Sequence, residues 1–365
     1  MKNFDYKEYL INTRRYFHSI PELAYNEYKT QAHIVKELKS LGLNLRTVGT
    51  GVIARLDIGK NKTLAFRSDI DALPITEKGD KPYKSKHEGF MHACGHDGHI
   101  ANLLAFAKYC SLNPEKLSCN IVFIFQPAEE TEGGAINMIE NGALDGEIYA
   151  IHLDPSLKKG IVGVGSGVSM AGAYEFDITA AGESSHCAEK HKGTDALHAL
   201  MDVVLNTYND IPEDIKDDTV FHCGKISGGV ARNIVADSAA ANCTLRYFEF
   251  SRLKTVLDLI DGNIKKAEQV YGAKFNINML CNYIPLENSE RCIEKVKKQI
   301  ECVPLPRRFT AEDFAFYLKE IDGCLIWLGT DGGEGRKLHS ADFDFDESVL
   351  SSGLELFIAL VEEKD

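Results

Sequence analysis

Helical and strand-like hydrophobic patterns alternate along the first part of the chain. Two continuous apolar runs of strand length, 119–126 and 148–155, indicate strands that are buried on both faces. Two shorter β-rich runs, 51–58 and 62–70, are separated by a polar turn and predict a hairpin. Helical spacing of apolar residues covers 5–20 and 26–42. Helices are also predicted over 97–110, an apolar stretch that opens with an acidic residue, and over 133–144. Helices between buried strands predict an α/β domain with a mostly parallel sheet.

The pattern changes after about Gly167. Strand, helix, strand, strand, helix and strand follow over 173–182, 193–208, 219–229, 233–248, 251–272 and 273–280. This β-α-β-β-α-β order predicts a small α+β domain inserted into the larger one. The remaining chain predicts three helices and the strand 323–329, which can rejoin the first sheet. We therefore expect a discontinuous large domain, 1–166 with 284–365, and an inserted domain, 167–283.

Composition narrows the range of partners. Hydrophobic residues make up 44% of the chain and charged residues 26%, as in ordinary globular proteins. The formal net charge of −13 argues against nucleic acid or an anionic membrane as partner, because both are bound through positive charge. The N-terminal residues contain no apolar signal region, and no stretch has the length of a membrane span. We expect a cytoplasmic protein whose ten cysteines are mostly buried, reduced thiols.

Reactive side chains gather at predicted strand ends and in the loops beside them, where α/β proteins place functional groups. These side chains belong to Asp69, Asp71, Cys94, His96, Glu129, Glu130, His152 and His339. Each of them alone is unremarkable. Together, thiolate, imidazole and carboxylate groups form the donor set of a metal site.

The adjacent carboxylates Glu129 and Glu130 fit the needs of hydrolysis by two metal ions. One carboxylate must bind a metal, and a second must stay within hydrogen-bond reach of the attacking water. Consecutive side chains leave an extended backbone in opposite directions, and Pro127 helps to fix the turn. The two residues can therefore have different roles, although the pattern does not say which has which.

Four motifs in this order resemble those of a known family: "RSDIDALP", "MHACGHDGH", "QPAEE" and "LHSADFDFDE". They are similar to the signatures of metal-dependent N-acyl-amino-acid amidohydrolases. This family includes hippurate hydrolases, auxin-conjugate hydrolases of plants and bacterial N-acetyldiaminopimelate deacetylases. The resemblance covers essentially the whole chain, including the inserted domain.

The resemblance implies a dinuclear metal site in the large domain. Cys94, as a thiolate, would bridge the two ions, and Glu129 would act as general base and then as general acid. The remaining ligands would be His96, Glu130, His152 and His339. Two divalent ions are implied; thiolate and imidazole favour zinc, while manganese, nickel and cobalt are alternatives.

Three aspartates are candidates for supporting the ligands without touching a metal. Asp97 could cap the helix that it opens or orient a ligand histidine. Asp69 and Asp71 could support ligands too, or could form ordinary salt bridges between loops.

The resemblance also implies a function for the inserted domain as a lid or dimerisation domain. His186 matches the histidine that stabilises the oxyanion, with His191 as a second candidate. Asn233 matches the residue that binds the substrate α-carboxylate, and Arg232 could add charge attraction. Several loop positions depart from the family pattern, including Cys187, which leaves the preferred acyl group open.

We therefore expect hydrolysis of the amide bond of N-acyl-L-amino acids, a small-molecule substrate. Narrower alternatives are an N-acetyldiaminopimelate deacetylase of lysine biosynthesis, a dipeptidase and an aminobenzoyl-glutamate carboxypeptidase. Two alternatives of other classes are a thiol hydrolase with Cys94 as nucleophile and a non-enzymatic metal-binding protein. The resemblance allows a homodimer formed through the inserted domain.

Overall fold

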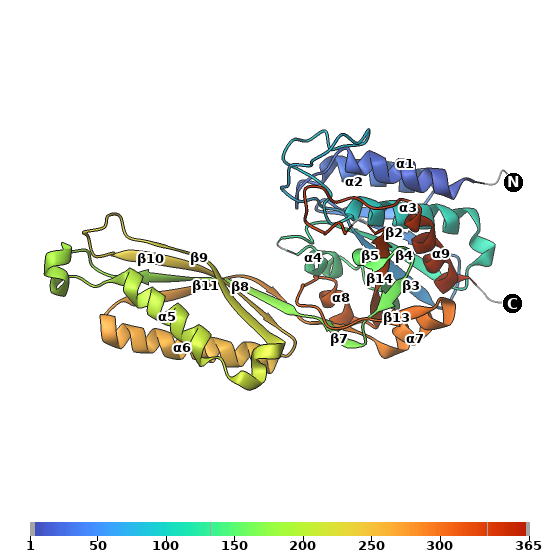
Figure 1. Cartoon of the computed structure of the whole chain (residues 1–365). Helices are drawn as coiled ribbons and strands as arrows, with labels where there is room; N and C mark the ends of the chain where they lie inside the picture. Colours follow the sequence, from blue (N-terminus) through green and yellow to red (C-terminus); the bar gives the residue numbers. More distant parts are fainter. Residues whose placement is uncertain (1–3, 132, 334, 363–365) are drawn as a thin grey trace. The chain divides into compact units, whose positions relative to one another are not determined.

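The structure is a computed structural model that describes residues 4–131, 133–333 and 335–362. The chain forms two compact units, which are described separately (Figure 1). The large unit contains the described residues of Met1–Ser169, Glu287–Pro306 and Asp313–Asp365. The inserted unit contains Met170–Leu286 and Arg307–Glu312. None of the described helices is both long and apolar enough to cross a bilayer.

An eight-stranded sheet forms the centre of the large unit, in the order β1-β2-β4-β3-β5-β14-β6-β13. Its strands are β1 (Asn44–Val48), β2 (Gly51–Leu56), β3 (Thr63–Asp69), β4 (Asn120–Gln126), β5 (Glu147–Lys158), β6 (Val162–Val164), β13 (Cys302–Pro304) and β14 (Gly323–Asp331). β3 runs parallel to both β4 and β5, and β14 runs parallel to β5. The predicted α/β fold with a mostly parallel sheet is confirmed, and the last strand does rejoin this sheet.

The predicted hairpin between 51–58 and 62–70 is wrong. β4 lies between the two strands and pairs antiparallel with β2 and parallel with β3. β4 is apolar on both faces and nearly all of it is buried, so it occupies a central position that a local turn signal does not reveal. The antiparallel partner of β2 on its other side is β1, a short and mostly exposed strand that the hydrophobic pattern did not predict.

One large apolar core lies between the sheet and five helices, to which α3 contributes most. The helices of this unit are α1 (Tyr6–His18), α2 (Tyr28–Ser40), α3 (His96–Leu112), η1 (Pro114–Lys116), α4 (Ala135–Glu140), α7 (Glu290–Gln299), α8 (Ala315–Glu320) and α9 (Val349–Val361). Those that pack on this core are α1, α2, α3, α7 and α9. α3 is buried along most of its length, which fixes the residues at its N-terminus relative to the sheet.

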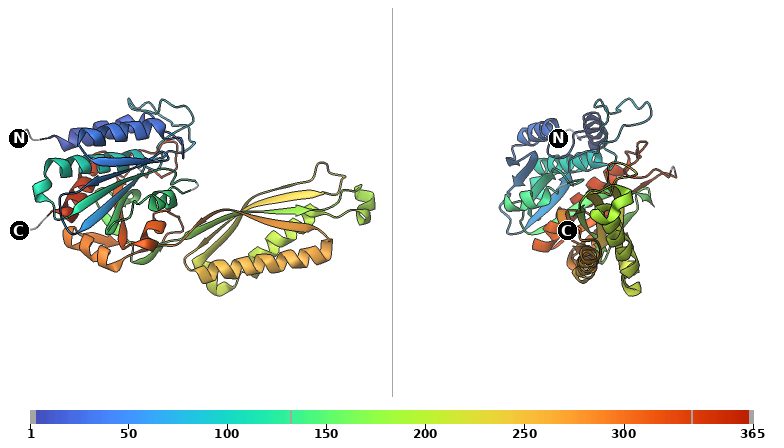
Figure 2. Two further views of the ribbon diagram at one scale, coloured as in Figure 1. Left: turned by 180° about the vertical axis from the view of Figure 1, so that it is seen from behind. Right: turned by 90° about the vertical axis from the view of Figure 1, so that its left-hand side faces the viewer.

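The inserted unit is a four-stranded antiparallel sheet in the order β11-β8-β10-β9, with α5 and α6 packed on one face (Figure 2). Its elements are β8 (Gly172–Ala181), η2 (Cys187–Lys192), α5 (Ala196–Asp210), η3 (Glu213–Asp218), β9 (Thr219–Gly228), β10 (Ser238–Tyr247), α6 (Phe250–Tyr271) and β11 (Lys274–Tyr283). A separate two-stranded sheet joins β7 (Gly167–Met170) and β12 (Leu286–Asn288). The predicted β-α-β-β-α-β order of the inserted α+β fold is confirmed.

Candidate metal centre

The sheet brings the predicted strand-end residues to one edge. Asp69 at the end of β3 lies opposite Gln126 at the end of the parallel strand β4. The segments with Asp71 and with Glu130 therefore leave the sheet side by side, and the Glu130 N–H donates to Asp71 Oδ2 at 3.0 Å. His152 lies in the neighbouring strand β5. His152 is level with Asp69, because Ala150 of β5 pairs with Arg67 of β3, but β5 itself continues to Lys158, beyond the predicted strand end at 155.

The five proposed ligands form two overlapping groups. In one group the ligand atoms of Cys94, His96 and His152 lie within 4.8 Å of one another, and in the other those of Cys94, Glu130 and His339 do. Cys94 Sγ lies 3.5 Å from His152 Nε2, and Glu130 Oε1 lies 3.3 Å from His339 Nε2. Since Cys94 is common to both groups, its sulfur has the position that a bridging ligand requires.

Hydrogen bonds orient the two buried histidines. His96 Nδ1 lies 3.0 Å from the carbonyl oxygen of Asp71, and His152 Nδ1 lies 2.8 Å from that of Leu153. A carbonyl oxygen only accepts, so each Nδ1 carries a proton, and Nε2 is the ring nitrogen that would bind a metal. His96 Nε2 and Glu130 Oε1 are buried and have no hydrogen-bond partner among the described residues. These orphaned donor atoms fit divalent metal ions.

The local charge also favours a cation. Burial alone would lower the pKa of His96, but Asp69, Asp71 and Glu130 outweigh it and raise the pKa to about 10. Burial raises the pKa of the Cys94 thiol, and the negative charges of nearby carboxylates raise it further. Burial acts on the two pKa values in opposite directions, but nearby carboxylates raise both, which indicates a negative potential at the site. A divalent ion would neutralise this potential and favour the thiolate.

Asp69 is part of a polar network below the proposed ligands. Its Oδ1 lies 2.6 Å from Nδ1 of His99, whose Nε2 accepts from the Leu153 N–H at 3.0 Å. The other carboxylate oxygen, Oδ2, accepts from Arg67, which also binds Asp313. The network connects β3, α3 and β5, so Asp69 supports the segments that carry His96 and His152 rather than an isolated loop.

Asp97 does not cap its helix. Its Oδ2 accepts from Arg14 Nε at 2.8 Å and lies 2.8 Å from His18 Nδ1, while its Oδ1 has no partner among the described residues. The N-cap position belongs to Gly95, whose φ of +86° suits glycine. His92, two residues before Cys94, is buried in the same loop and stays outside both ligand groups.

Glu129 and Glu130 lie in a turn and not on an extended backbone. The expected divergence of their side chains is wrong: carboxylate oxygens of both lie within 4.8 Å of each other and of a His96 ring nitrogen. The turn follows Ala128, which has a φ of +57°, an unfavourable value for a residue with a Cβ. Glu27 Oε1 accepts from the Ala128 N–H at 3.0 Å and holds this conformation.

In the inserted unit, the segments with His186 and Asn233 are neighbours. The Cys187 N–H donates to the Asn233 carbonyl at 2.9 Å, and His186 forms an antiparallel bridge with Ile234. The side chains of His186 and Asn233 are exposed, and so is Arg232. His191 is also exposed, in the short helix η2.

Comparison with known proteins places the chain in a family. The family model that describes Peptidase family M20/M25/M40 matches residues 65–363. The chain belongs to this family. An N-acetyldiaminopimelate deacetylase from Shouchella clausii (strain KSM-K16) is 33% identical over 371 residues, which cover 97% of this chain and 98% of that relative. An N-acetyl-L-cysteine deacetylase from Bacillus subtilis (strain 168) is 33% identical and covers 93% of this chain and 84% of its own length.

Among solved structures, a dinuclear metal binding peptidase of the M20 family from Bacillus subtilis has the same fold. The TM-score is 0.83 at 30% sequence identity, and the match covers 97% of each chain. As a member of Peptidase family M20/M25/M40, this chain is a metal-dependent amidohydrolase that acts on linear amides.

Sequence reasoning missed three residues whose side chains bind segments next to the proposed ligands: Arg14, His18 and Glu27. All three are fully buried. Arg14 offers a signal that could have been used, because it lies on the same helical face as the apolar Leu10 and Phe17. A charged residue on the buried face of a helix indicates an ion pair inside the protein.

Proposed function

We propose that the protein hydrolyses the amide bond of N-acyl-L-amino acids at a centre of two divalent ions. The observation that carries this proposal is the double membership of Cys94 in the two ligand groups. Five unrelated polar residues would not produce two three-residue donor groups that share one buried thiol.

On this proposal each ion has two ligands of its own besides the shared Cys94. His96 and His152 would bind one ion through Nε2, and Glu130 and His339 would bind the other. Zinc is the favoured ion for this set of thiolate, imidazole and carboxylate ligands, with manganese, nickel and cobalt as alternatives.

The ions, when bound, would polarise the amide carbonyl and lower the pKa of a bound water. Glu129 takes the proton of the attacking water and delivers it to the departing nitrogen as the C–N bond breaks. Glu129 is buried, with only 8% of its surface exposed. Its carboxylate lies beside the Glu130 carboxylate and the His96 ring. The products are a carboxylate and a free amino acid.

We further propose that the chain divides into a catalytic metal-binding domain, 1–166 with 284–365, and an inserted domain, 167–283. The inserted domain would contact the substrate and act as a lid, or join two copies of the chain in a homodimer. His186 would stabilise the oxyanion, and Asn233 would bind the α-carboxylate, with added attraction from Arg232. Their exposure and their pairing through the backbone support a substrate-contacting pair.

The alternative of a thiol hydrolase fits less well. A nucleophilic cysteine needs a lowered pKa, whereas burial and nearby carboxylates raise that of Cys94. It would also leave the second ligand group, Glu130 with His339, without a purpose. The names of the two relatives favour an acetyl group over a larger acyl group, which includes N-acetyldiaminopimelate among the candidate substrates.

A substrate panel tests this function. Metal-free protein is reconstituted with zinc, manganese, cobalt or nickel and assayed on N-acetyl- and N-benzoyl-amino acids and on dipeptides. We expect hydrolysis of N-acetyl-amino acids that have a free α-carboxylate, and a loss of activity when this carboxylate is amidated. Equal rates on the amidated substrates, or no hydrolysis with any of the metals, would contradict the proposal.

A further inference from the structure

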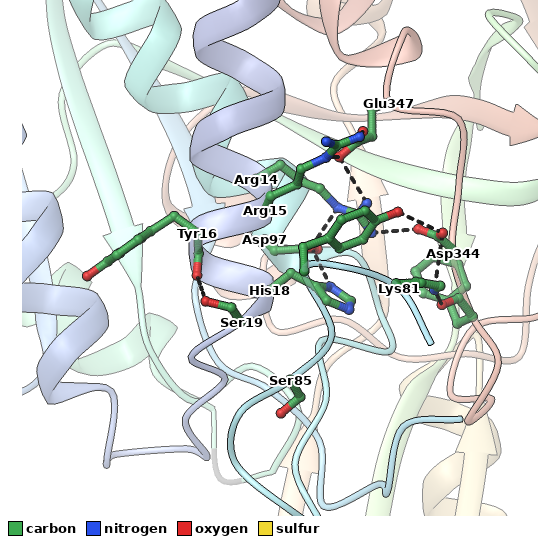
Figure 3. A network of polar contacts seen from close by, with 12 residues as sticks. Arg14, Arg15, Tyr16, His18, Ser19, Lys81, Ser85, Asp97, Asp344 and Glu347 are labelled. Atoms are coloured by element: carbon green, nitrogen blue, oxygen red, sulfur yellow. Dashed lines mark hydrogen bonds and ion pairs between the residues drawn. The ribbon is translucent and has the colours of Figure 1, made fainter. Parts of the chain in front are cut away.

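Arg14 of α1 is fully buried and binds three carboxylates (Figure 3). Its Nε donates to Asp97 at 2.8 Å, its Nη2 to Asp344 at 2.8 Å, and its Nη1 to Glu347 at 3.2 Å. All the nitrogens of the guanidinium are therefore engaged. Its carbon also lies 4.4 Å from the ring centre of Phe345, which covers the planar group from one side.

The three carboxylates come from two of the segments that carry proposed ligands. Asp97 directly follows His96 in the first turn of α3, three residues after Cys94. Asp344 and Glu347 lie five and eight residues after His339, in the loop that leads to α9. One side chain thus connects the segment that carries a ligand of one proposed ion with the segment that carries a ligand of the other.

A second contact joins the same two segments near the centre. The His339 N–H donates to the Ala93 carbonyl at 2.8 Å, next to Cys94. His339 has a φ of +60°, in the left-handed region that few residues other than glycine adopt. The His339 side chain is 53% exposed, and the loop that follows it is bound by Arg14 through Asp344 and Glu347.

The carboxylates of Asp97 and Asp344 differ in how many partners they have besides Arg14. Asp97 is fully buried, and its Oδ2 is bound by Arg14 and His18, each at 2.8 Å. Asp344 has further donors, since it lies 3.1 Å from both Lys81 Nζ and the Tyr83 hydroxyl. Loss of the Arg14 guanidinium would therefore break the connection between Asp97, which follows the Cys94–His96 segment, and the loop that carries Asp344. Asp344 itself would keep Lys81 and Tyr83 as partners.

We propose that Arg14 is a positioning residue of the metal centre, which sets the distance between the Cys94–His96 segment and His339 by binding Asp97 and Asp344 at once. This inference rests on the proposed ligands. It gives α1, which contributes no ligand itself, an indirect part in metal binding.

The test compares Arg14→Lys and Asp344→Asn with a matched control, Arg15→Lys. Lysine at 14 keeps the charge but cannot bind two carboxylates in fixed directions. Asparagine at 344 removes the charge that Arg14 binds. Arg15 is the neighbouring arginine on the same helix and binds Glu347, but its side chain is 43% exposed and contacts neither Asp97 nor Asp344 in the described structure.

The readouts are the affinity for each of two Co²⁺ equivalents and the thiolate-to-cobalt absorption band that reports Cys94. In both test variants we expect at least one equivalent to bind about 10- to 100-fold more weakly, the usual effect of removing a group that orients a ligand. The band should change in position or intensity in Arg14→Lys. Arg15→Lys should bind both equivalents as the wild type does.

Folded Arg14→Lys and Asp344→Asn proteins that bind both equivalents with wild-type affinity would overturn the inference. If Arg14→Lys fails to fold, Asp344→Asn decides the matter, because Asp344 is partly exposed and asparagine can still accept from Lys81 and Tyr83. A wild-type protein without the thiolate band would contradict the proposed ligands themselves. If the wild type shows the thiolate band and Cys94→Ser loses it, the proposed ligand Cys94 is supported. Unchanged metal binding in Arg14→Lys and Asp344→Asn would then reject only the positioning role of Arg14.

Discussion

The two sets of candidate functional residues are held in opposite ways. In the large unit, four of the five proposed ligands are buried or nearly so, and both buried histidines are oriented by hydrogen bonds through Nδ1. In the inserted unit, His186 and Asn233 are exposed, and backbone hydrogen bonds keep their segments together. Apart from the exposed His339, the first set is enclosed by the protein, whereas the second set is open to solvent.

This difference matches what each set is proposed to bind. Resident ions need donor atoms that are held in place beforehand, because a small displacement weakens every metal–ligand bond. Groups that bind a substrate must stay open to a molecule that enters and leaves, so exposure is expected of them. Changes in the first set should therefore alter metal binding and chemistry, and changes in the second should alter catalysis or KM at constant metal content.

The largest effect is expected for Glu129→Gln. Turnover should fall by about 10²- to 10⁴-fold, the usual contribution of a positioned acid–base group, while both metal equivalents remain bound. Rate measurements with metal analysis of the same sample check this. The matched variant Glu130→Gln should lose metal affinity. Near-normal turnover of Glu129→Gln would show that another group is the base.

The exposed set is tested first by His186→Ala. We expect kcat to fall by about 10²- to 10³-fold, as for the loss of one oxyanion donor, with metal content unchanged. His191→Ala is the control, because His191 is an exposed histidine of the same loop region. A loss of activity in His191→Ala, with His186→Ala unaffected, would exchange the two assignments.

A pH-dependent effect is expected at Glu27, which holds the turn before Glu129. Burial raises the pKa of Glu27 to about 7. Between its ordinary pKa and about pH 7 the folded protein holds a proton that the unfolded chain releases, so stability falls as pH rises through this window. Glutamine does not titrate, so the free energy of unfolding of Glu27→Gln should not fall in this window. Relative to wild type it should rise by up to roughly 3 kcal/mol between pH 4.5 and 8. Urea unfolding of metal-free protein measures this difference, and a constant difference across pH would contradict it.

The smallest effect is expected for Asn233→Ala. Loss of a hydrogen bond to a charged group should raise KM by roughly 10- to 100-fold and change kcat less. Arg232→Ala should have a weaker effect, because attraction between exposed charges is screened. Steady-state kinetics on an N-acetyl-amino acid separates the two parameters. An unchanged KM in Asn233→Ala would place the carboxylate contact elsewhere.

The fold could be predicted where an element is determined by its own residues, and not where it depends on distant segments of the chain. The helical spacing in α1 and the apolar runs of α3 and β4 predicted these elements correctly, since each depends on its own residues. The hairpin prediction failed because β4, more than 60 residues beyond β2 in the chain, takes the place between β2 and β3. Pairing partners of a sheet are set by distant segments, which a local pattern does not contain.

The candidate site was predictable where it lies in compact motifs. Cys94 with His96, and Glu129 with Glu130, are close in the sequence and were found together. Arg14 and Glu27 were missed because each stands alone in or beside an ordinary helix, and their partners lie 83 and 101 residues away. Such support becomes visible only when the chain is folded.

Metal analysis of the active protein tests the central claim most directly. Purified protein is titrated with a chelator while bound transition metal and hydrolysis of an N-acetyl-amino acid are measured on the same samples. We predict two divalent ions per chain at full activity, a loss of activity in parallel with metal, and recovery when metal is added back. Full activity in protein that contains no bound transition metal would contradict the two-metal centre.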